Sequence, residues 1–462
     1  MKRYTTLSAA IALVLGASGS AMAGSIADVD QVGSGNDAYI EQEDSNGALA
    51  TINQAGNDNQ ASIENLHISD DVVSTVNQSG NGNFGDIFTY DSDRAVSTIN
   101  QDGNENGATI DVDSSFDVNG QIDQYGSINL ADINQWEFSD DSVATIIQDG
   151  TANAADITQD ETIAGAAAID QYGSDNDASI SQAIGENNTA TITQDSDFAI
   201  ADITQSGVDN VAEIYQEDSQ DAWASIDQVG EGNDAYIENL PISDFATSSI
   251  SQDGDSNIAF ISTYDSDGGN STITQTDYQN GAAIVIDSSF FTDADITQDG
   301  DINLADIEIA EFSDGSSASI SQDGIANAAG IWVEDCVDCA ASITQNGNDN
   351  VADIYQTGVS NTADITQTGT SHIAYIDQSG SYNDASITQA GSSNEADILQ
   401  SGEYNIASID QAGSDNYATI TQSGMGTAAA PNVASISQRG SGHSASIDQS
   451  GGGGNTATIV QY

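Results

Sequence analysis

The stretch QNGNDNVADIYQTGVSNTADITQ, residues 345–367, holds two consecutive copies of one eleven-residue unit. Each copy opens with Gln, and Gly, Asn, Ala and Ile follow at fixed places in the pattern QxGxxNxAxIx. Repetition of so short a unit indicates that one structural element has been copied along the chain. The glutamine returns every eleven residues at Gln345, Gln356, Gln367, Gln378, Gln389, Gln400, Gln411 and Gln422.

Within one unit the residues alternate as they do in a β-strand. Asn350, Ala352, Ile354 and Gln356 fall on one face, and the residues between them fall on the other. Residues 357–360 follow and include the glycine that a chain reversal favours. Each unit therefore predicts a strand of seven residues and a turn of four.

A single strand of this kind cannot bury its Ile and Ala, whereas stacked strands form a continuous sheet with a continuous interior. The repeat therefore predicts a β-solenoid, in which equivalent residues form columns. A buried Ile contributes roughly 1.5–3 kcal/mol and a paired amide about 1 kcal/mol, so the aliphatic columns stabilise the fold and amide ladders fix its register. Besides the glutamines, the predicted ladder residues are Asn350, Asn361, Asn383, Asn394, Asn405, Asn416, Ile354, Ile365, Ile376, Ile387, Ile398 and Ile409, and the predicted turn glycines are Gly347, Gly358, Gly369, Gly380, Gly391, Gly402 and Gly413.

Two strands are predicted for each winding of the coil, which we call a rung. Between residues 31 and 182, units with a glycine turn alternate with looser units that lack it. A period of two predicts two facing parallel sheets, whereas a three-sided coil would show a period of three. About 38 units at two strands per rung give about 19 rungs. The glycine turns of this region start at Gln31, Gln54, Gln78, Gln101, Gln124, Gln148 and Gln171.

The sequence also contains a duplication that is much longer than the eleven-residue repeat. ENLHISD begins at Glu64 and ENLPISD at Glu238, which is 174 positions later. Two loose units separate the glycine turns at Gln171 and Gln205, so we expect these turns to change edges of the coil there. The predicted organisation is a signal peptide at 1–23, a repeat block at 24–182, phase-shifted units at 183–204, a duplicate block at 205–344 and regular repeats at 345–462.

The first 23 residues have the pattern of a secretory signal peptide. Lys2 and Arg3 precede an apolar stretch, and small residues at 21–23 form a cleavage site. No second apolar run is long enough to span a membrane, so we expect an exported chain that does not cross a membrane.

Acidic residues dominate the remaining composition. The formal charge of −69 becomes −71 when the two basic residues of the signal peptide are removed. Without a basic patch, nucleic acid is excluded as a partner. Outward residues such as Asp353, Asp364 and Asp397 could bind Ca²⁺ weakly, although a solvated acidic face is the favoured interpretation. No cofactor is expected, because the repeats lack the calcium-binding pattern of β-rolls.

Cysteine and histidine give no sign of a reactive centre. Cys336 and Cys339 form a CxxC pair that could be a disulfide or two thiols. His67, His372 and His443 lie far apart, and His372 stands in the Asn column of the repeat. The sequence therefore predicts a protein that is not an enzyme.

The repeat resembles that of the curlin family, whose subunits assemble into curli, the amyloid fibres of bacterial biofilms. The resemblance rests on sets such as Gln378, Gly380, Asn383, Ala385 and Gln389, and on the final Gln-Tyr. It implies a secreted subunit that leaves through an outer-membrane pore, meets a nucleator at the cell surface and polymerises with copies of itself. We expect the first and last rungs to join end to end in a fibre that supports adhesion and aggregation.

The alternative is a monomeric secreted β-solenoid that acts as an adhesin or an ice-binding protein. Ice binding requires a regular Thr array. The outward pairs Asp353/Tyr355, Asp364/Thr366, Tyr375/Asp377 and Asp397/Leu399 are too mixed for such an array.

Overall fold

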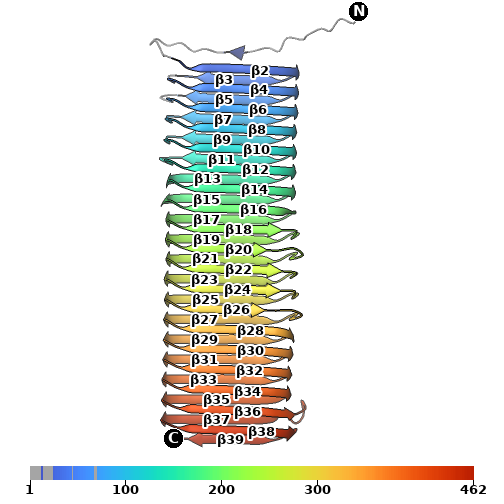
Figure 1. Ribbon diagram of the computed structural model, residues 1–462, viewed down its shortest axis with the longest axis vertical. Coiled ribbons are helices and arrows are strands. Elements are labelled where there is room, and N and C mark those ends of the chain that lie inside the picture. Colours follow the sequence, from blue (N-terminus) through green and yellow to red (C-terminus); the bar gives the residue numbers. More distant parts are fainter. Residues whose placement is uncertain (1–11, 14–23, 44, 67–69) are drawn as a thin grey trace, which may run out of the picture. The chain divides into compact units, whose positions relative to one another are not determined.

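The computed structural model describes residues 12–13, 24–43, 45–66 and 70–462 (Figure 1). The predicted signal peptide lies outside the described residues except for residues 12–13, and His67 also lies outside them. The described part of the chain is all-β and contains no helix. Accordingly, none of its elements is an apolar helix of the length that a membrane span requires.

The chain divides into two compact units, Met1–Gly232 and Asn233–Tyr462. In unit 1, each strand pairs in parallel with the strand two places further along the chain, so even-numbered and odd-numbered strands form separate sheets (Figure 1). The even-numbered strands are β2 (Ile26–Ser34), β4 (Leu49–Asn57), β6 (Val73–Asn81), β8 (Val96–Asn104), β10 (Asn119–Ser127), β12 (Val143–Thr151), β14 (Ala166–Ser174), β16 (Thr189–Asp197) and β18 (Val211–Glu217). The odd-numbered strands are β1 (Ala12–Leu13), β3 (Asp37–Gln42), β5 (Gln60–Leu66), β7 (Phe84–Tyr90), β9 (Gly107–Asp113), β11 (Leu130–Trp136), β13 (Ala154–Ile163), β15 (Asp177–Glu186), β17 (Ile200–Val208) and β19 (Trp223–Glu231).

The strands of unit 2 pair in the same way, each in parallel with the strand two places further along the chain. Its even-numbered strands are β20 (Asp234–Asn239), β22 (Ile258–Tyr264), β24 (Gly281–Asp287), β26 (Leu304–Ile309), β28 (Ala328–Val337), β30 (Val351–Val359), β32 (Ile373–Ser381), β34 (Glu395–Glu403), β36 (Tyr417–Met425) and β38 (Ser444–Gly452). Its odd-numbered strands are β21 (Thr247–Asp255), β23 (Asn270–Tyr278), β25 (Asp293–Asp301), β27 (Ser317–Ile325), β29 (Ala340–Asn348), β31 (Thr362–Thr370), β33 (Asp384–Ser392), β35 (Asn405–Ser414), β37 (Asn432–Ser441) and β39 (Thr456–Gln461).

The predicted β-solenoid with two strands per rung is confirmed. Among the described residues, β2 to β39 provide 38 strands in about 19 rungs. Pairing is in register, so Gln345 on β29 lies beside Gln367 on β31. Ala352 and Ile354 are fully buried on β30, whereas Val351 on the same strand is 40% exposed. The core is therefore a thin layer of Ala, Ile, Gln and Asn between two sheets.

The strands are longer than the sequence pattern indicates. We predicted a strand at 350–356 and a turn at 357–360, but β30 spans Val351–Val359. Pairing continues because Gly358 stays beside Gly380 of the next rung, with only residues 360–361 outside the ladder. Each bend lies directly on the bend below it, so its backbone groups can bond along the coil.

The glycine turns change sheets within unit 1, as the alternation predicts. Gln171 and its glycine turn lie on the even-numbered β14, and Gln205 with the next glycine turn lies on the odd-numbered β17. Between them, Gln182 on β15 and Gln194 on β16 keep the core columns unbroken, since they pair with Gln205 and Gln171. The interior repeat therefore continues while the turn chemistry shifts by half a rung.

Candidate functional site

The buried glutamines of unit 2 form a hydrogen-bonded column along the odd-numbered sheet. Gln367 is typical: its Nε2 donates to Oε1 of Gln389 at 2.9 Å and to the carbonyl oxygen of Val351 on the facing sheet at 2.9 Å. Both N–H groups of the side-chain amide are thus bonded, so the buried amide has no unpaired donor. The column contains Gln252, Gln275, Gln298, Gln322, Gln345, Gln367, Gln389, Gln411, Gln438 and Gln461, with Nε2 to Oε1 distances of 2.7–2.9 Å.

A second column lies on the even-numbered sheet and has a buried end. It runs from Gln356 through Gln378, Gln400 and Gln422 to Gln449 at 2.8–2.9 Å. Val333 occupies the same place one rung before Gln356, and the buried Oε1 of Gln356 has no hydrogen-bond partner. Val333 in place of a Gln is the sequence feature that marks the end of this column. The eleven-residue pattern alone did not show that Val333 and Gln356 are neighbours.

The asparagines act mainly as clamps on the turns. Asn361 Nδ2 donates to the carbonyl of Thr357 at 2.9 Å and to that of Gly380 on the next rung at 3.2 Å. Its Oδ1 accepts the backbone N–H of Asn383 at 3.0 Å. Direct amide contacts also occur, as from Asn405 to Asn383 at 2.9 Å. The predicted Asn residues Asn350, Asn361, Asn383, Asn394, Asn405 and Asn416 are all 0–1% exposed.

His372 takes over the role of Asn in this column. Its backbone N–H donates to Oδ1 of Asn350 at 3.0 Å, and its Nδ1 accepts the backbone N–H of Asn394 at 3.3 Å. Its Nε2 lies 3.2 Å from the carbonyl of Thr368. These contacts require the neutral ring with its proton on Nε2. Burial lowers the pKa of His372, although hydrogen bonds to the carbonyls of Thr368 and Gly391 oppose that shift.

The turn glycines of residues 347–413 stack rung on rung, and a side chain at any of them would overlap the next rung. Gly358 has φ +115° and Gly380 has φ +105°, in the region that glycine favours. A Cβ on Gly380 would overlap the carbonyl of Gly402, with the carbonyl carbon only 3.0 Å away. Close approach between rungs thus depends on glycine. The same overlap with the next rung is found at Gly347, Gly358, Gly369, Gly391, Gly402 and Gly413.

The predicted aliphatic column lies at the centre of the core. Ile354, Ile365, Ile376, Ile387, Ile398 and Ile409 are 0–1% exposed. The structure thus brings together the Gln, Asn, Ile and Gly columns of residues 345–422 in one repeating cross-section. This arrangement can extend a sheet by one rung at a time.

The CxxC pair braces one of the looser turns. Cys336 and Cys339 are joined in a disulfide with Cα atoms 5.8 Å apart, which settles the open choice between a disulfide and two thiols. Both side chains are buried. Cys339 stands in the Asn column, since its backbone N–H donates to Oγ of Ser316 at 3.1 Å and its Sγ accepts from Asn361 N–H at 3.4 Å. The disulfide therefore joins the end of β28, where Cys336 lies, to the turn before β29, where Cys339 lies.

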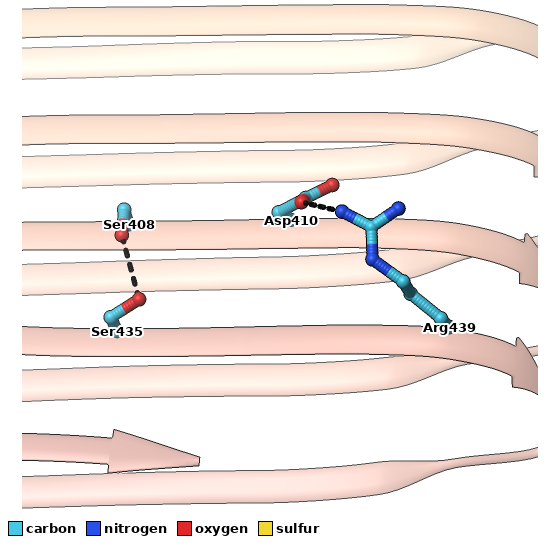
Figure 2. Close-up of polar contacts among 4 residues, drawn as sticks. All are labelled: Ser408, Asp410, Ser435 and Arg439. Carbon is cyan, nitrogen blue, oxygen red and sulfur yellow. Dashed lines mark hydrogen bonds and ion pairs between the residues drawn. The ribbon is translucent and has the colours of Figure 1, made fainter. Parts of the chain in front are cut away.

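The two arginines of the described chain form surface ion pairs. Arg439 on β37 contacts Asp410 on β35 at 2.9 Å, beside a hydrogen bond of 3.1 Å between Ser408 and Ser435 (Figure 2). Arg94 contacts Asp117 at 2.6 Å. Exposed pairs of this kind contribute at most about 1 kcal/mol, so they are minor beside the columns.

The outward acids of the described residues do not gather into metal sites. In residues 24–43, 45–66 and 70–462, no group of three or more His, Cys, Asp or Glu side chains could hold a metal ion. Burial against neighbouring strands raises the pKa of twelve carboxyls above its ordinary value. The affected residues are Glu64, Asp86, Asp111, Asp132, Asp156, Asp170, Asp202, Asp306, Asp353, Asp377, Asp384 and Asp397.

We expect the folded chain to be more stable near pH 4 than at pH 7. Folding raises the pKa of these carboxyls above that in the unfolded chain, which is 3.8 for Asp. The stability that each contributes is therefore present below the unfolded pKa and is lost as the pH rises through the folded pKa. His372 has the opposite sign but is a single group. Urea denaturation at constant ionic strength should therefore give a higher midpoint at pH 4 than at pH 7. A midpoint that rises with pH would contradict this expectation.

The outward residues of unit 2 are sorted between its two sheets. Of the pairs predicted to be too mixed for a regular array, three lie on the even-numbered sheet, and only Asp364/Thr366 lies on the odd-numbered sheet. The odd-numbered sheet presents mostly hydroxyl side chains. The argument that the outward residues are too mixed for a regular array therefore applies to the even-numbered sheet. These hydroxyl residues include Thr272, Thr274, Ser319, Ser321, Ser342, Thr344, Ser386 and Thr388.

The fold and its columns define a parallel β-solenoid with two strands per rung, in which each rung repeats buried amides, aliphatic residues and turn clamps. Six segments match the family model of the curlin associated repeat, at residues 26–56, 166–195, 340–369, 358–391, 391–424 and 432–462. The chain thus belongs to the curlin family, a family of structural proteins, as its repeat predicted. No curated protein matches the chain.

Proposed function

We propose that the chain is a secreted structural subunit that polymerises end to end into curli-like amyloid fibres at the bacterial surface and in the biofilm matrix. Membership of the curlin family and the repeating cross-section support this function. In this proposal a secretion pore delivers the chain, a nucleator starts assembly, and the fibres support adhesion and aggregation. The acidic surface delays assembly by repulsion between chains, which salt relieves.

The polarity of the glutamine columns is the observation that carries the proposal. Every Nε2 in a column donates toward the C-terminal side, to Oε1 of the next rung. At the last rungs, Gln449 accepts from Gln422 and donates to the carbonyl of Val433, and Gln461 donates to that of Ser444. An amide has two N–H donors, so each can offer one to a following rung. The first rung presents the matching acceptor in Gln31, which donates to Gln54.

The repeat also fixes the register of the proposed joint. Placing β2 and β3 of one subunit after β38 and β39 of another sets Gln31 on Gln449 and Ile40 on Ile459. Residues 12–13 pair with Tyr39 and Ile40 of β3, and they fall within the predicted signal peptide. Removal of that peptide would expose the edge of β3 to which β39 of another subunit can bond.

Gly451 provides a test that separates fibre growth from folding. It has φ +111°, and a Cβ there meets no atom within 4 Å in the folded chain. In the proposed joint Gly33 of the next subunit lies above it, in the contact that excludes a side chain at Gly358, Gly380 and Gly402. Gly451→Ala should therefore slow seeded elongation at least tenfold while the chain still folds. The measurement is thioflavin fluorescence with preformed wild-type seeds.

Gly442→Ala is the matched control for this experiment. Gly442 has φ +69° and open space around it, and the equivalent position one rung earlier carries Asp415. This variant should elongate at the wild-type rate. Wild-type fibres should give reflections near 4.8 Å and 10 Å. Elongation of Gly451→Ala at the wild-type rate would overturn the proposed joint, and absence of these reflections would overturn the amyloid fibre itself.

A further inference from the structure

A groove crosses the outward face of the even-numbered sheet in unit 2. It has a volume of about 440 Å³ and is lined by residues of β22, β24, β26, β28 and β30. Five adjacent strands span roughly 19 Å at the spacing of a β-sheet. Phe260 lies at one end of the groove, where its ring stacks on Tyr236 with centroids 5.5 Å apart. The groove lies on the sheet surface, away from the buried columns.

Small residues alternate with large ones to form this groove. Gly281 and Ala283 on β24 leave space between Phe260 on β22 and Leu304 on β26, which is 60% exposed. On β28, a Cβ at Gly330 would lie 2.6 Å from Cζ3 of Trp332. The indole of Trp332 therefore occupies the space that a side chain at position 330 would fill. Aromatic and aliphatic groups thus line the groove on several sides.

Carboxylates flank the indole on both neighbouring strands. Asp306 on β26 and Asp353 on β30 pair in register with Gly330, and Oδ1 of Asp353 lies 3.0 Å from the position of a Cβ on Gly330. Desolvation raises the pKa of both carboxyls, and Glu308 adds to the shift at Asp306. The arginines of the described chain are paired elsewhere, with Asp117 and Asp410. The charge of this groove is therefore left for a ligand to balance.

We infer that the groove binds an organic cation with an apolar body, such as an arylalkyl guanidinium or ammonium. The face of an indole attracts cations, and carboxylates on either side of it add a second attraction. Leu304 and Phe260 would contact the apolar body of the ligand. The strongly negative chain concentrates cations near its surface and repels anions. This site belongs to the folded chain and does not depend on the proposed fibre.

The duplicated block shows which residues make the groove. At positions 174 residues earlier, Thr158 replaces Trp332, Asp156 replaces Gly330, and Ser179 replaces Asp353. The earlier strand β13 keeps the same fold with these polar residues. Exchanging the residues of β28 for those of β13 therefore removes the indole by a change that the solenoid accommodates.

The test compares three probes that share a benzyl group and differ in charge, on the folded full-length chain. Phenethylguanidinium is the cation, 2-phenylethanol the neutral analogue and phenylacetate the anion. Isothermal titration should show at least tenfold tighter binding of the cation than of either analogue. The double variant Gly330→Asp with Trp332→Thr should lose at least tenfold in affinity for the cation. Nonspecific attraction to a negative surface would instead make this variant bind the cation more tightly, because the variant gains a negative charge.

Further variants make the result independent of one substitution. Tyr417→Thr removes an exposed aromatic from the same sheet outside the groove and should leave binding unchanged. Asp306→Asn should weaken binding of the cation but not of the alcohol. Unchanged affinity in both groove variants, or equal binding of all three probes, would overturn the inference. A neutral octapeptide with one Arg identifies the source: tighter binding than the free cation indicates a basic peptide, and weaker binding indicates a small organic cation.

Discussion

Replacing Gly380 by Ala is expected to lower the free energy of unfolding by at least ~3 kcal/mol. Gly380 has φ +105°, which costs an alanine about 1–2 kcal/mol. The added Cβ would also overlap the carbonyl of Gly402, which belongs to the rigid backbone of the next rung. Relieving that overlap requires the two rungs to separate, and separation weakens the hydrogen bonds of β32 and β34 along the bend. Urea denaturation of the unassembled chain measures the loss.

Gly451→Ala separates the two contributions to this loss. Its φ of +111° is close to that of Gly380, but no atom lies within 4 Å of the added Cβ. We therefore expect a loss of only about 1–2 kcal/mol, which is the conformational part. Equal losses at the two positions would show that contact between glycine carbonyls does not limit rung spacing. The pair thus tests the internal packing by stability and the proposed joint by elongation.

The architecture could be predicted because one unit encodes one strand. Ala352, Ile354 and Gln356 alternate with outward residues, and all three are buried on β30. The two-unit period likewise predicted that a strand pairs with the strand two places on. The strand ends were wrong because Gly358 was interpreted as loop, whereas its backbone remains in the ladder with Gly380. A single sequence unit does not show that bends stack on one another.

Contacts between rungs are the part that the sequence did not reveal. The end of the even-numbered column depends on Val333 and Gln356 being neighbours, although 23 positions separate them. The groove depends on Gly330 and Trp332 together with Asp306 and Asp353, which come from three strands. The rung length varies between 22 and 27 residues, as at Gln345 to Gln367 and Gln411 to Gln438. Register must therefore be known before such neighbours can be assigned.

Replacing Gln389 by Glu is expected to make the stability of the solenoid strongly dependent on pH. Gln389 is fully buried, accepts from Gln367, and donates to Gln411 and to the carbonyl of Ile373. A carboxylate at this place would face two acceptor oxygens and leave both without a donor. Burial and repulsion raise the pKa of the new carboxyl above its unfolded value of about 4.3. With 1.36 kcal/mol per pH unit, a folded pKa of 7 or more costs up to ~4 kcal/mol at pH 7.

The sign of this dependence distinguishes it from a simple loss of packing. A raised pKa leaves stability present below about pH 4 and removes it as the pH rises, because the protonated carboxyl can donate to Gln411 while the anion cannot. The difference between variant and wild type in urea should therefore be small at pH 4 and large at pH 7. Thr388→Glu adds the same charge to an exposed position on β33 and should show little of this effect. An equal loss of stability at both pH values would mean that the amide column acts through packing alone. A loss that follows the titration of the new carboxyl identifies the hydrogen bonds of the column as the contacts that hold successive rungs in register.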